Sequence, residues 1–297
     1  MKGVIITNPF DRSETQLYKV KRMLREFSYL GVDVETASND RFAAYVEDGK
    51  SVCRLKADFA LYFDKDKYTA RLLEKSGVRV FNSASATEIC DDKMLTHIVL
   101  SDGGIAMPTT LSGALCYDKN GVVSDEYLNG AVEKLGLPLV VKECHGSYGE
   151  QVYLAETHAR LREIVESIKN KSYLFQQYVS QSCGEDMRVI VIGGKAVCGM
   201  LRKSTTDFRS NVHRGGTAVA ADISEDIAKL CEKTAKIIGL DYCGIDVLLK
   251  PFPQICEVNS NAMFQAMEET TSVNVARRYA QHIVDSISHT ALKPTRF

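Results

Sequence analysis

The sequence predicts an α/β (α+β) protein made of a small parallel domain followed by two mixed lobes. Over the first part of the chain, short apolar runs typical of strands alternate with helical patterns, which favours a parallel sheet with helices packed on it. Further on, two apolar runs flank Gly193-Gly194, and such a two-residue loop is typical of an antiparallel hairpin. We therefore expect three units, at residues 1–85, 86–172 and 173–297.

Composition excludes several classes of protein. The 297 residues are 45% apolar and 25% charged, as in ordinary globular proteins, and their net charge of −1 gives no global field to attract nucleic acid. No apolar run approaches the roughly 18 residues of a membrane span, and the N-terminus has no signal-peptide pattern. The nine cysteines include no C-x-x-C pair, which favours reduced thiols. We expect a cytoplasmic protein without nucleic-acid or membrane partners.

The first unit is predicted to begin with the strand Gly3–Thr7. Ser13-x-x-Gln16 then has the form of a capping box, opening a helix that Gly31 ends. The predicted inner face of this helix consists of Leu17, Val20, Leu24 and Phe27. Further strands are predicted at Val32–Thr36, Phe59–Phe63 and Val78–Phe81, with a helix at Tyr68–Lys75. The first strand is followed by Asn8-Pro9-Phe10 rather than G-x-G-x-x-G, which argues against a nicotinamide site.

The second and third units mix helices with hairpins. In the second, helices are predicted from Asp91 to about Gly104, at Glu126–Leu135 and at Thr157–Ile168, and strands at Pro138–Glu143 and Val152–Ala155. In the third, strands are predicted at Leu174–Val179, Arg188–Ile192 and Lys195–Arg202, and helices at Ser224–Ile238 and around Val275–Ile287.

The stretch Asp241–Asn261 contains two acidic residues within apolar strands. The strands are predicted at Cys243–Leu249 and Gln254–Val258, so that Asp246 shares a face with Gly244 and Leu248, and Glu257 shares a face with Ile255 and Asn259. An uncompensated buried carboxylate costs several kcal/mol. Mg²⁺, which prefers carboxylate and amide oxygens, would compensate it. The alternative from the residues alone is that Asp246 pairs with an arginine and Asn259 caps a turn.

Two other segments have the chemistry of an anion site. Lys142 ends an apolar strand just before the glycine turn Gly146–Gly149, and such a turn beside an ammonium suits a phosphate. The alternative is an ordinary strand end and turn. Phe208–Gly216 follows Arg202 and Lys203 and adds further cations, which suggests an anionic substrate or a triphosphate, or else a solvated loop.

Gln176–Val179 leaves a strand at the junction of the two lobes, a natural place for a nucleotide base. Asp186 follows closely and could hold ribose hydroxyls.

The order of these features from about Asn82 to Ile287 resembles the ATP-grasp superfamily, and within it the RimK-like branch of glutamate-adding ligases. Its most specific parts are FRSNVHRGG and GIDVLL…EVN at their mutual spacing. The resemblance implies an ATP-grasp fold whose two lobes clasp ATP. It implies phosphate contacts from Lys93 and Lys142, an adenine site at Gln177 and Tyr178, ribose contact from Asp186, and contact with the reacting phosphate from Arg209 and Asn211. Ser147, Val179 and Ser210 are further implied nucleotide contacts, and Asp246, Glu257 and Asn259 are implied ligands of two Mg²⁺ or Mn²⁺.

The implied activity is that of an ATP-dependent carboxylate–amine ligase working through an acyl phosphate, with Arg202 and Arg209 stabilising developing charge. An acidic amino acid such as glutamate, its carboxylate clamped by Arg202, would be added to a small-molecule, peptide or protein carboxylate. A kinase of the same fold, an amino-acid-biosynthesis ligase and an ATP sensor without turnover remain alternatives, and a homo-oligomer is left open. EVN is followed by the unusual segment Ser260–Glu269, Gln177 stands where a glutamate is usual and Gln151 where a glycine is common, so the sequence departs from the branch on the substrate side.

Overall fold

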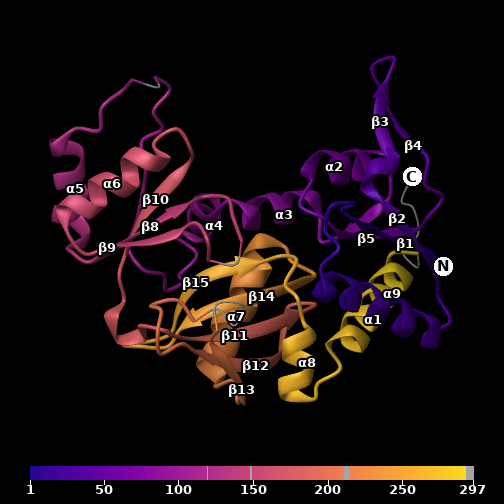
Figure 1. Cartoon of the computed structure of the whole chain (residues 1–297). Coiled ribbons are helices and arrows are strands. Elements are labelled where there is room, and N and C mark those ends of the chain that lie inside the picture. The colour runs from indigo at the N-terminus through magenta and orange to yellow at the C-terminus, as the bar shows by residue number, and fades with distance from the viewer. Residues whose placement is uncertain (119, 148, 211–214, 292–297) are drawn as a thin grey trace.

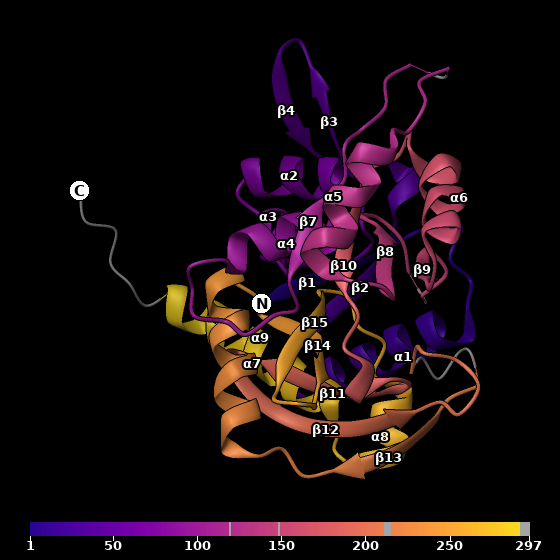
Figure 2. The same cartoon turned by 90° about the vertical axis from the view of Figure 1, so that its left-hand side faces the viewer.

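The computed structural model describes residues 1–118, 120–147, 149–210 and 215–291. Its N-terminal part is a parallel sheet of order β2-β1-β5-β6 (Figure 1). The strands are β1 (Lys2–Thr7), β2 (Asp33–Ser38), β5 (Phe59–Phe63) and β6 (Arg79–Phe81), and the helices are α1 (Glu14–Tyr29) and α2 (Lys67–Lys75). The predicted parallel α/β arrangement is confirmed. A hairpin of β3 (Ala44–Glu47) and β4 (Lys50–Cys53) was not predicted, and it projects from this sheet (Figures 1 and 2).

The buried face of α1 differs from the predicted one. Ser13 caps the helix as expected, its Oγ accepting from the backbone N–H of Gln16 at 3.3 Å. The buried side chains, however, are Gln16, Lys19, Met23, Glu26 and Phe27, whereas Leu17 is 50% exposed. Of the predicted face, Phe27 is buried and Val20 and Leu24 pack against the core. Apolar periodicity therefore misplaced only Leu17, but it could not indicate the three buried polar residues.

The middle lobe is built on an antiparallel sheet of order β7-β10-β8-β9. Its strands are β7 (Thr110–Ser112), β8 (Leu139–Glu143), β9 (Val152–Ala155) and β10 (Tyr173–Gln177), and its helices are α5 (Asp125–Leu135) and α6 (His158–Ile168). The helix predicted to begin at Asp91 is α4 (Lys93–Leu100), because Asp92 caps the backbone N–H groups of Met94 and Leu95. The preceding helix α3 (Ala84–Asp91) was not predicted. Strand β10 pairs with β8 and β7, so it belongs to this sheet although we expected the third unit to begin at residue 173. The division into three units remains a prediction.

The C-terminal lobe carries the antiparallel sheet β13-β12-β11-β14-β15. Its strands are β11 (Glu185–Ile192), β12 (Lys195–Lys203), β13 (Thr217–Ala221), β14 (Tyr242–Leu248) and β15 (Gln254–Asn259), and its helices are α7 (Glu225–Ile238), α8 (Gln265–Thr271) and α9 (Val275–Ala291). Short 3-10 turns at Asn39–Arg41 and Ser180–Ser182 complete the described elements. In the part of the chain that the structure describes, no helix is long and apolar enough to cross a membrane.

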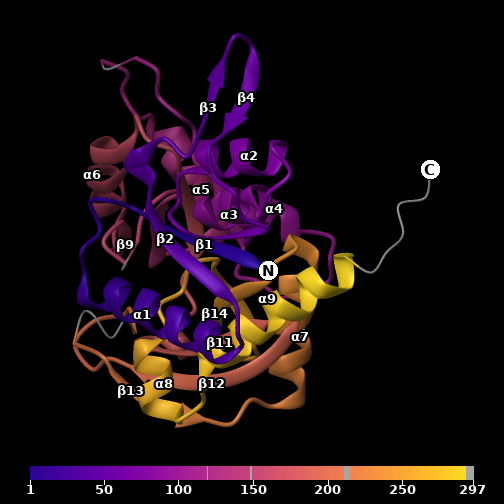
Figure 3. The same cartoon turned by 90° about the vertical axis from the view of Figure 1, so that its right-hand side faces the viewer.

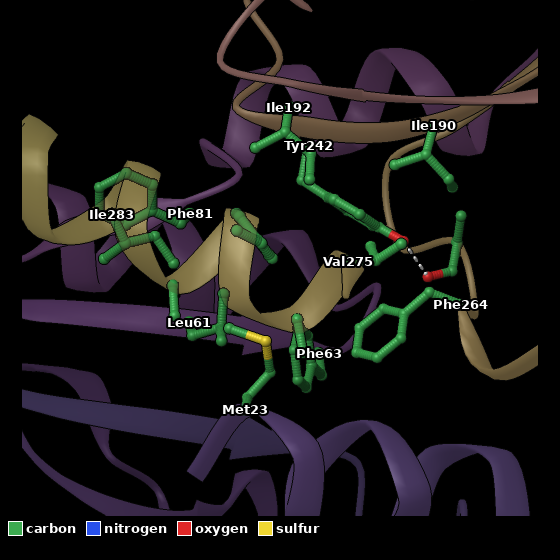
Figure 4. Close-up of a cluster of buried hydrophobic side chains, with 14 of the residues drawn as sticks. Met23, Leu61, Phe63, Phe81, Ile190, Ile192, Tyr242, Phe264, Val275 and Ile283 are labelled. Atoms are coloured by element: carbon green, nitrogen blue, oxygen red, sulfur yellow. Dashed lines mark hydrogen bonds between the residues drawn. The ribbon is translucent and has the colours of Figure 1, made fainter. Parts of the chain in front are cut away.

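One apolar core joins the first and last parts of the chain. Helices α1 and α9 lie side by side beneath the N-terminal sheet (Figure 3). Phe63 of β5, Tyr242 of β14 and Phe264 meet in this core, where the Tyr242 hydroxyl donates to the carbonyl of Ala262 at 2.8 Å (Figure 4). The N-terminal domain is thus fixed against the segment that follows β15.

Candidate active site

A cavity of about 100 Å³ is lined by residues of both the middle sheet and the C-terminal sheet. Strands β8 and β10 of the one sheet lie above β14 and β15 of the other in Figure 1. Most of the residues predicted from the sequence to be catalytic or to bind nucleotide or metal line the cavity. These are Lys142, Gln177, Tyr178, Val179, Asp186, Arg202, Arg209, Ser210, Asp246 and Glu257. The fold therefore gathers residues from distant stretches of the chain at one place.

The two acidic residues of the C-terminal strands face each other. Strands β14 and β15 pair with Asp246 opposite Glu257 and Gly244 opposite Asn259, which places these side chains on one face. The register shifts beyond Asp246, so that Val247 pairs with Ile255 and Cys256 is the extra residue. Ile255 is therefore buried in the apolar core with Val247, and the predicted face shared by Ile255 and Glu257 is wrong.

Asp246 is held by two arginines. Arg188 donates to both of its carboxylate oxygens at 2.7 Å, and the Nη2 atom of Arg202 lies 3.0 Å from its Oδ2 atom. Burial acts to raise the pKa of Asp246, but the Arg188 and Arg202 guanidiniums outweigh it and hold the pKa at about 2. Asp246 is therefore ionised at neutral pH, as a metal ligand must be. The alternative prediction, that Asp246 pairs with an arginine, is also confirmed.

Arg202 is occupied on both sides. It is 2% exposed and donates to Asp186 through Nε at 2.7 Å and through Nη2 at 2.5 Å, in addition to its contact with Asp246. Because Nε and Nη2 are both engaged, this arrangement does not favour the expected bidentate clamp on a substrate carboxylate, and that role stays a prediction. Arg202 neutralises the two buried aspartates.

Glu257 and Asn259 complete the candidate metal ligands. The Glu257 side chain is 30% exposed, and its Oε1 atom lies 3.5 Å from the Nζ atom of Lys93. The buried Asn259 amide nitrogen has no hydrogen-bond partner among the described residues. Two carboxylates and an amide oxygen on paired strands are the hard donors that suit Mg²⁺. The residues present therefore fit the predicted metal, although their role as ligands remains a prediction.

Two predicted phosphate-binding lysines approach this site. The Lys142 ammonium is buried beside Cys256, with Nζ and Sγ 3.7 Å apart. Lys93 begins α4 and donates to the carbonyl of Gly146 in the glycine turn at 3.2 Å. Ser147 does not line the cavity, and its hydroxyl accepts from Lys65 at 3.1 Å.

The strand end at the lobe junction lines the other end of the cavity. The Gln177 backbone N–H donates to the carbonyl of Thr109 at 2.8 Å, which fixes the strand end. The Tyr178 ring lies edge-on to Phe208, with 6.3 Å between centroids, and burial raises the Tyr178 pKa to about 12. Gln176 also lines the cavity, and its amide nitrogen donates to the Thr110 hydroxyl at 2.9 Å.

Arg209 bridges the two lobes. Asp207 holds its guanidinium through Nε at 2.9 Å and Nη2 at 2.8 Å, and its Nη1 donates to the carbonyls of Gly149 at 2.6 Å and Val152 at 2.9 Å. The neighbouring Ser210 is buried beside Asp186. The predicted contact Asn211 lies outside the described residues.

Two charged residues at this site were missed by sequence reasoning. Arg188 lies directly opposite Asp246 on the neighbouring strand β11. The signal available in the sequence was the alternation of side chains along β11, which determines the face on which Arg188 lies. Lys65 follows β5 in the N-terminal part and forms an ion pair with Asp91 at 2.7 Å while it contacts the glycine turn. No local pattern around Lys65 indicates this contact, because it arises from the packing of separate parts of the chain.

Comparison with known proteins agrees with this geometry. Residues 90–283 match the model of a family described as RimK-like ATP-grasp domain. The chain is 35% identical over 216 residues to the N-acetylaspartylglutamate synthase A of Homo sapiens, which covers 71% of this chain and 54% of that protein. It is 34% identical over 218 residues to a probable alpha-L-glutamate ligase of Maridesulfovibrio salexigens, covering 72% of this chain and 69% of the other. The chain spans about half the length of the first of these curated relatives.

Solved structures show the same fold. The D-alanine–D-alanine ligase of Bacillus anthracis superposes with a TM-score of 0.74 at 16% identity, covering 98% of each chain. At that identity the likeness concerns the fold alone, and it confirms the predicted ATP-grasp arrangement. The matched segment contains every residue predicted to bind nucleotide or metal and occupies well over half of the chain. The chain belongs to the RimK-like ATP-grasp family.

Proposed function

We propose that the protein is an ATP-dependent carboxylate–amine ligase, which forms an amide bond and releases ADP and phosphate. The observation that carries this proposal is the Asp246–Glu257 pair across β14 and β15, which faces the same cavity as Lys142 and the strand end Gln177–Val179. A nucleotide whose base lay at that strand end would direct its phosphates toward these carboxylates. ATP-grasp enzymes use ATP and Mg²⁺ in general, which agrees with this orientation.

Each part of the site has a proposed task in that reaction. The backbone and ring of Tyr178 bind the adenine, while Lys93 and Lys142 hold phosphate oxygens by charge-assisted hydrogen bonds. Asp246, Glu257 and Asn259 would hold Mg²⁺, which supplies positive charge beside the phosphates. Arg209 stabilises the charge that develops on the transferred phosphate, and the closed lobes exclude water from the activated carboxylate.

The substrates are proposed from chemistry and from the relatives. Proteins named N-acetylaspartylglutamate synthase, beta-citrylglutamate synthase and alpha-L-glutamate ligase all carry glutamate in their names. We propose an acidic amino acid as the incoming amine and a carboxylate-bearing small molecule or peptide as its acceptor. With Arg202 occupied, the carboxylates of these substrates need another cation.

Phosphate release tests this proposal. The purified chain is incubated with ATP, Mg²⁺, each amino acid in turn and a pool of small carboxylates, and the products are weighed by mass spectrometry. We expect phosphate release to depend on an amino acid together with an acceptor, and a product lighter by one water than their sum. A stable phosphorylated product would instead show a kinase, and ATP binding without turnover in any mixture would show a sensor.

A further inference from the structure

Helix α1 contacts the unusual segment Ser260–Glu269 along its length. The Tyr18 hydroxyl donates to the Oε2 atom of Glu268 at 2.7 Å, and Nε of Arg22 donates to the same carboxylate at 2.9 Å. Between these two residues, Lys19 donates from Nζ to the Oδ1 atom of Asn261. This segment directly follows the candidate metal ligand Asn259, so α1 packs against the stretch of chain next to the candidate metal ligands.

Lys19 differs from its neighbours because it has no counter-ion. It is 1% exposed, and within the described ranges its ammonium forms no ion pair; its polar partner is the neutral amide of Asn261. Its Nζ atom lies 4.1 Å from the centroid of the Phe63 ring and 5.4 Å from that of Tyr242. Ring faces attract a cation but replace only part of its lost hydration. Burial alone lowers the pKa of Lys19 to about 7. A buried ammonium without a counter-ion destabilises the folded protein, which suggests that Lys19 has a functional role.

Other buried polar atoms near Lys19 also lack partners. Gln16 lies one turn earlier on α1 and donates to the carbonyl of Phe63 at 3.1 Å, yet its buried Oε1 atom has no partner in the described chain. The Asn259 amide nitrogen is unpaired in the same way. Phe63 is the last residue of β5, and the carboxyl ends of parallel strands are where open α/β sheets bind ligands. Buried polar groups normally have partners. The unpaired Asn259 N–H group therefore indicates an acceptor ligand, whereas the unpaired Gln16 Oε1 atom is itself an acceptor and could bond only to a donor.

We propose that Lys19, together with the unpaired Asn259 N–H group, anchors a subsite for a substrate carboxylate that does not react. This inference rests on the proposed ligase function and adds a substrate class to it. Asn261 lies two residues beyond Asn259, which is at most about 7 Å along an extended chain, so one small substrate can reach both places. The reacting carboxylate lies beside the metal ligands, and a second carboxylate of the same reaction binds Lys19.

In this structure the amide oxygen of Asn261 occupies the position of that carboxylate. The Asn261 side chain is only half-buried, so it can turn aside when a substrate enters. The subsite takes over the role that we expected of Arg202, whose Nε and Nη2 atoms are engaged with Asp186 and Asp246. The ligand is therefore a substrate with an additional carboxylate, and it comes either from the acceptor or from the amino acid.

Binding measurements on the full chain separate these sources. Calorimetry with Mg²⁺ and a non-hydrolysable ATP analogue present measures the affinity of N-acetyl-L-aspartate and N-acetyl-L-glutamate as acceptors, and of L-glutamate and L-aspartate as amines. The amide N-acetyl-L-asparagine is the comparator that lacks one carboxylate. The variants are Lys19→Met, which keeps the side-chain volume, and Lys21→Met, the same change on the exposed face of α1.

For at least one of the acidic probes we expect Lys19→Met to raise Kd tenfold or more. Lys21→Met should change the Kd of that probe less than twofold, and neither variant should change the Kd of the ATP analogue by more than twofold. Asn261→Asp is a second variant that supplies a permanent counter-ion to Lys19. This variant should also weaken binding of the substrate carboxylate about tenfold, because the new aspartate carboxylate occupies the subsite, even though the variant stabilises the fold. A structural role for Lys19 would not predict lost affinity in two stabilised variants.

Three results would overturn the subsite: unchanged affinity in Lys19→Met, equal binding of N-acetyl-L-asparagine and N-acetyl-L-aspartate, or no binding of any acidic probe to the wild type. Should Lys19→Met fail to fold, Asn261→Asp carries the same test. Amide formation by Lys19→Met with unchanged KM for both substrates would refute the subsite and leave the ligase function standing. Absence of amide formation by the wild type with all substrates would instead refute the function.

Discussion

Asp246 shows how a single residue can satisfy two interpretations that seemed exclusive. The paired arginines keep its carboxylate ionised, while its register partner Glu257 stays half-exposed and contacts only Lys93, at 3.5 Å, among the described ion pairs. The fold thus stabilises the buried charge through Arg188 and Arg202 and leaves the second carboxylate available. Glu257 is therefore the informative position for testing metal binding.

Replacing Glu257 by glutamine should abolish Mg²⁺-dependent turnover, by roughly 100-fold or more, because the ligand charge is lost while the shape is kept. The fold should remain intact, since the only described ion pair that is lost is the 3.5 Å contact with Lys93. Steady-state kinetics over a Mg²⁺ series, with a thermal melt, measures both. Glu163→Gln, on the exposed face of α6, is the control. Normal turnover by folded Glu257→Gln would remove this residue from the metal site.

Lys142→Ala should weaken the binding of ATP by about tenfold or more but leave the binding of adenosine nearly unchanged. The reason is that a charge-assisted hydrogen bond to phosphate contributes about 1.5–3 kcal/mol. Calorimetry with both ligands makes the comparison, and exposed Lys134→Ala on α5 serves as its control. Equal losses for ATP and adenosine would assign Lys142 to the structure of the cavity instead of to phosphate binding.

Lys19 also predicts a pH dependence of stability. Its pKa is lowered from 10.5 to about 7 by burial, so between these values the unfolded chain binds the proton and the folded chain does not. Stability from this group therefore rises with pH over that range, and its full cost is present below pH 7. Lys19→Met should stabilise the protein by a few kcal/mol at pH 6, since each pKa unit corresponds to about 1.4 kcal/mol. The gain should shrink toward pH 10. Urea unfolding at both pH values checks this, and a gain independent of pH would contradict the buried ammonium.

At the scale of elements, the sequence predicted what local pattern determines. Strands β1, β5, β8 and β14 and helices α6 and α7 were found near their predicted positions, because apolar period and capping residues are local signals. Local pattern could not predict the β-bulge at Cys256 or the burial of the Lys19 side chain. Both depend on a partner strand or segment that is distant in sequence. The predicted site residues that the structure describes come together or lie close by, whereas their hydrogen-bond partners, such as Arg188 for Asp246, emerged only from the register of the sheet.

The packing of β14 against the segment after β15 gives a further prediction. A Cβ atom added at Gly244 would lie 2.7 Å from that of Ala262, so the segment carrying Asn261 must shift. Gly244→Ala should cost about 1–3 kcal/mol of stability and raise the KM of the carboxylate substrate more than that of ATP. In Gly130→Ala the new Cβ atom on α5 meets nothing within 4 Å, so that control should be neutral or slightly stabilising. Denaturation and kinetics of the pair test whether Gly244 sets the position of this segment.

For the whole molecule, the cavity between the lobes is too small for the nucleotide that we propose. Its volume of about 100 Å³ compares with the roughly 300–1,000 Å³ of ligand pockets, so we expect the lobes to move apart when ATP enters. Arg209 crosses this opening, with hydrogen bonds of 2.6 and 2.9 Å to Gly149 and Val152 in the middle lobe. The arginine that we expect to act on phosphate therefore also holds the lobes closed.

Arg209→Ala should accordingly speed both entry and release of the nucleotide, because two hydrogen bonds between the lobes are removed. It should also lower kcat, since closure and charge stabilisation are lost together. Stopped-flow measurements with a fluorescent ATP analogue give both rate constants, and Arg160→Ala, on the exposed face of α6, controls for loss of charge. A lower kcat with unchanged nucleotide rates would confine Arg209 to the chemical step. Faster exchange of the nucleotide would show that the same side chain governs the opening of the cleft.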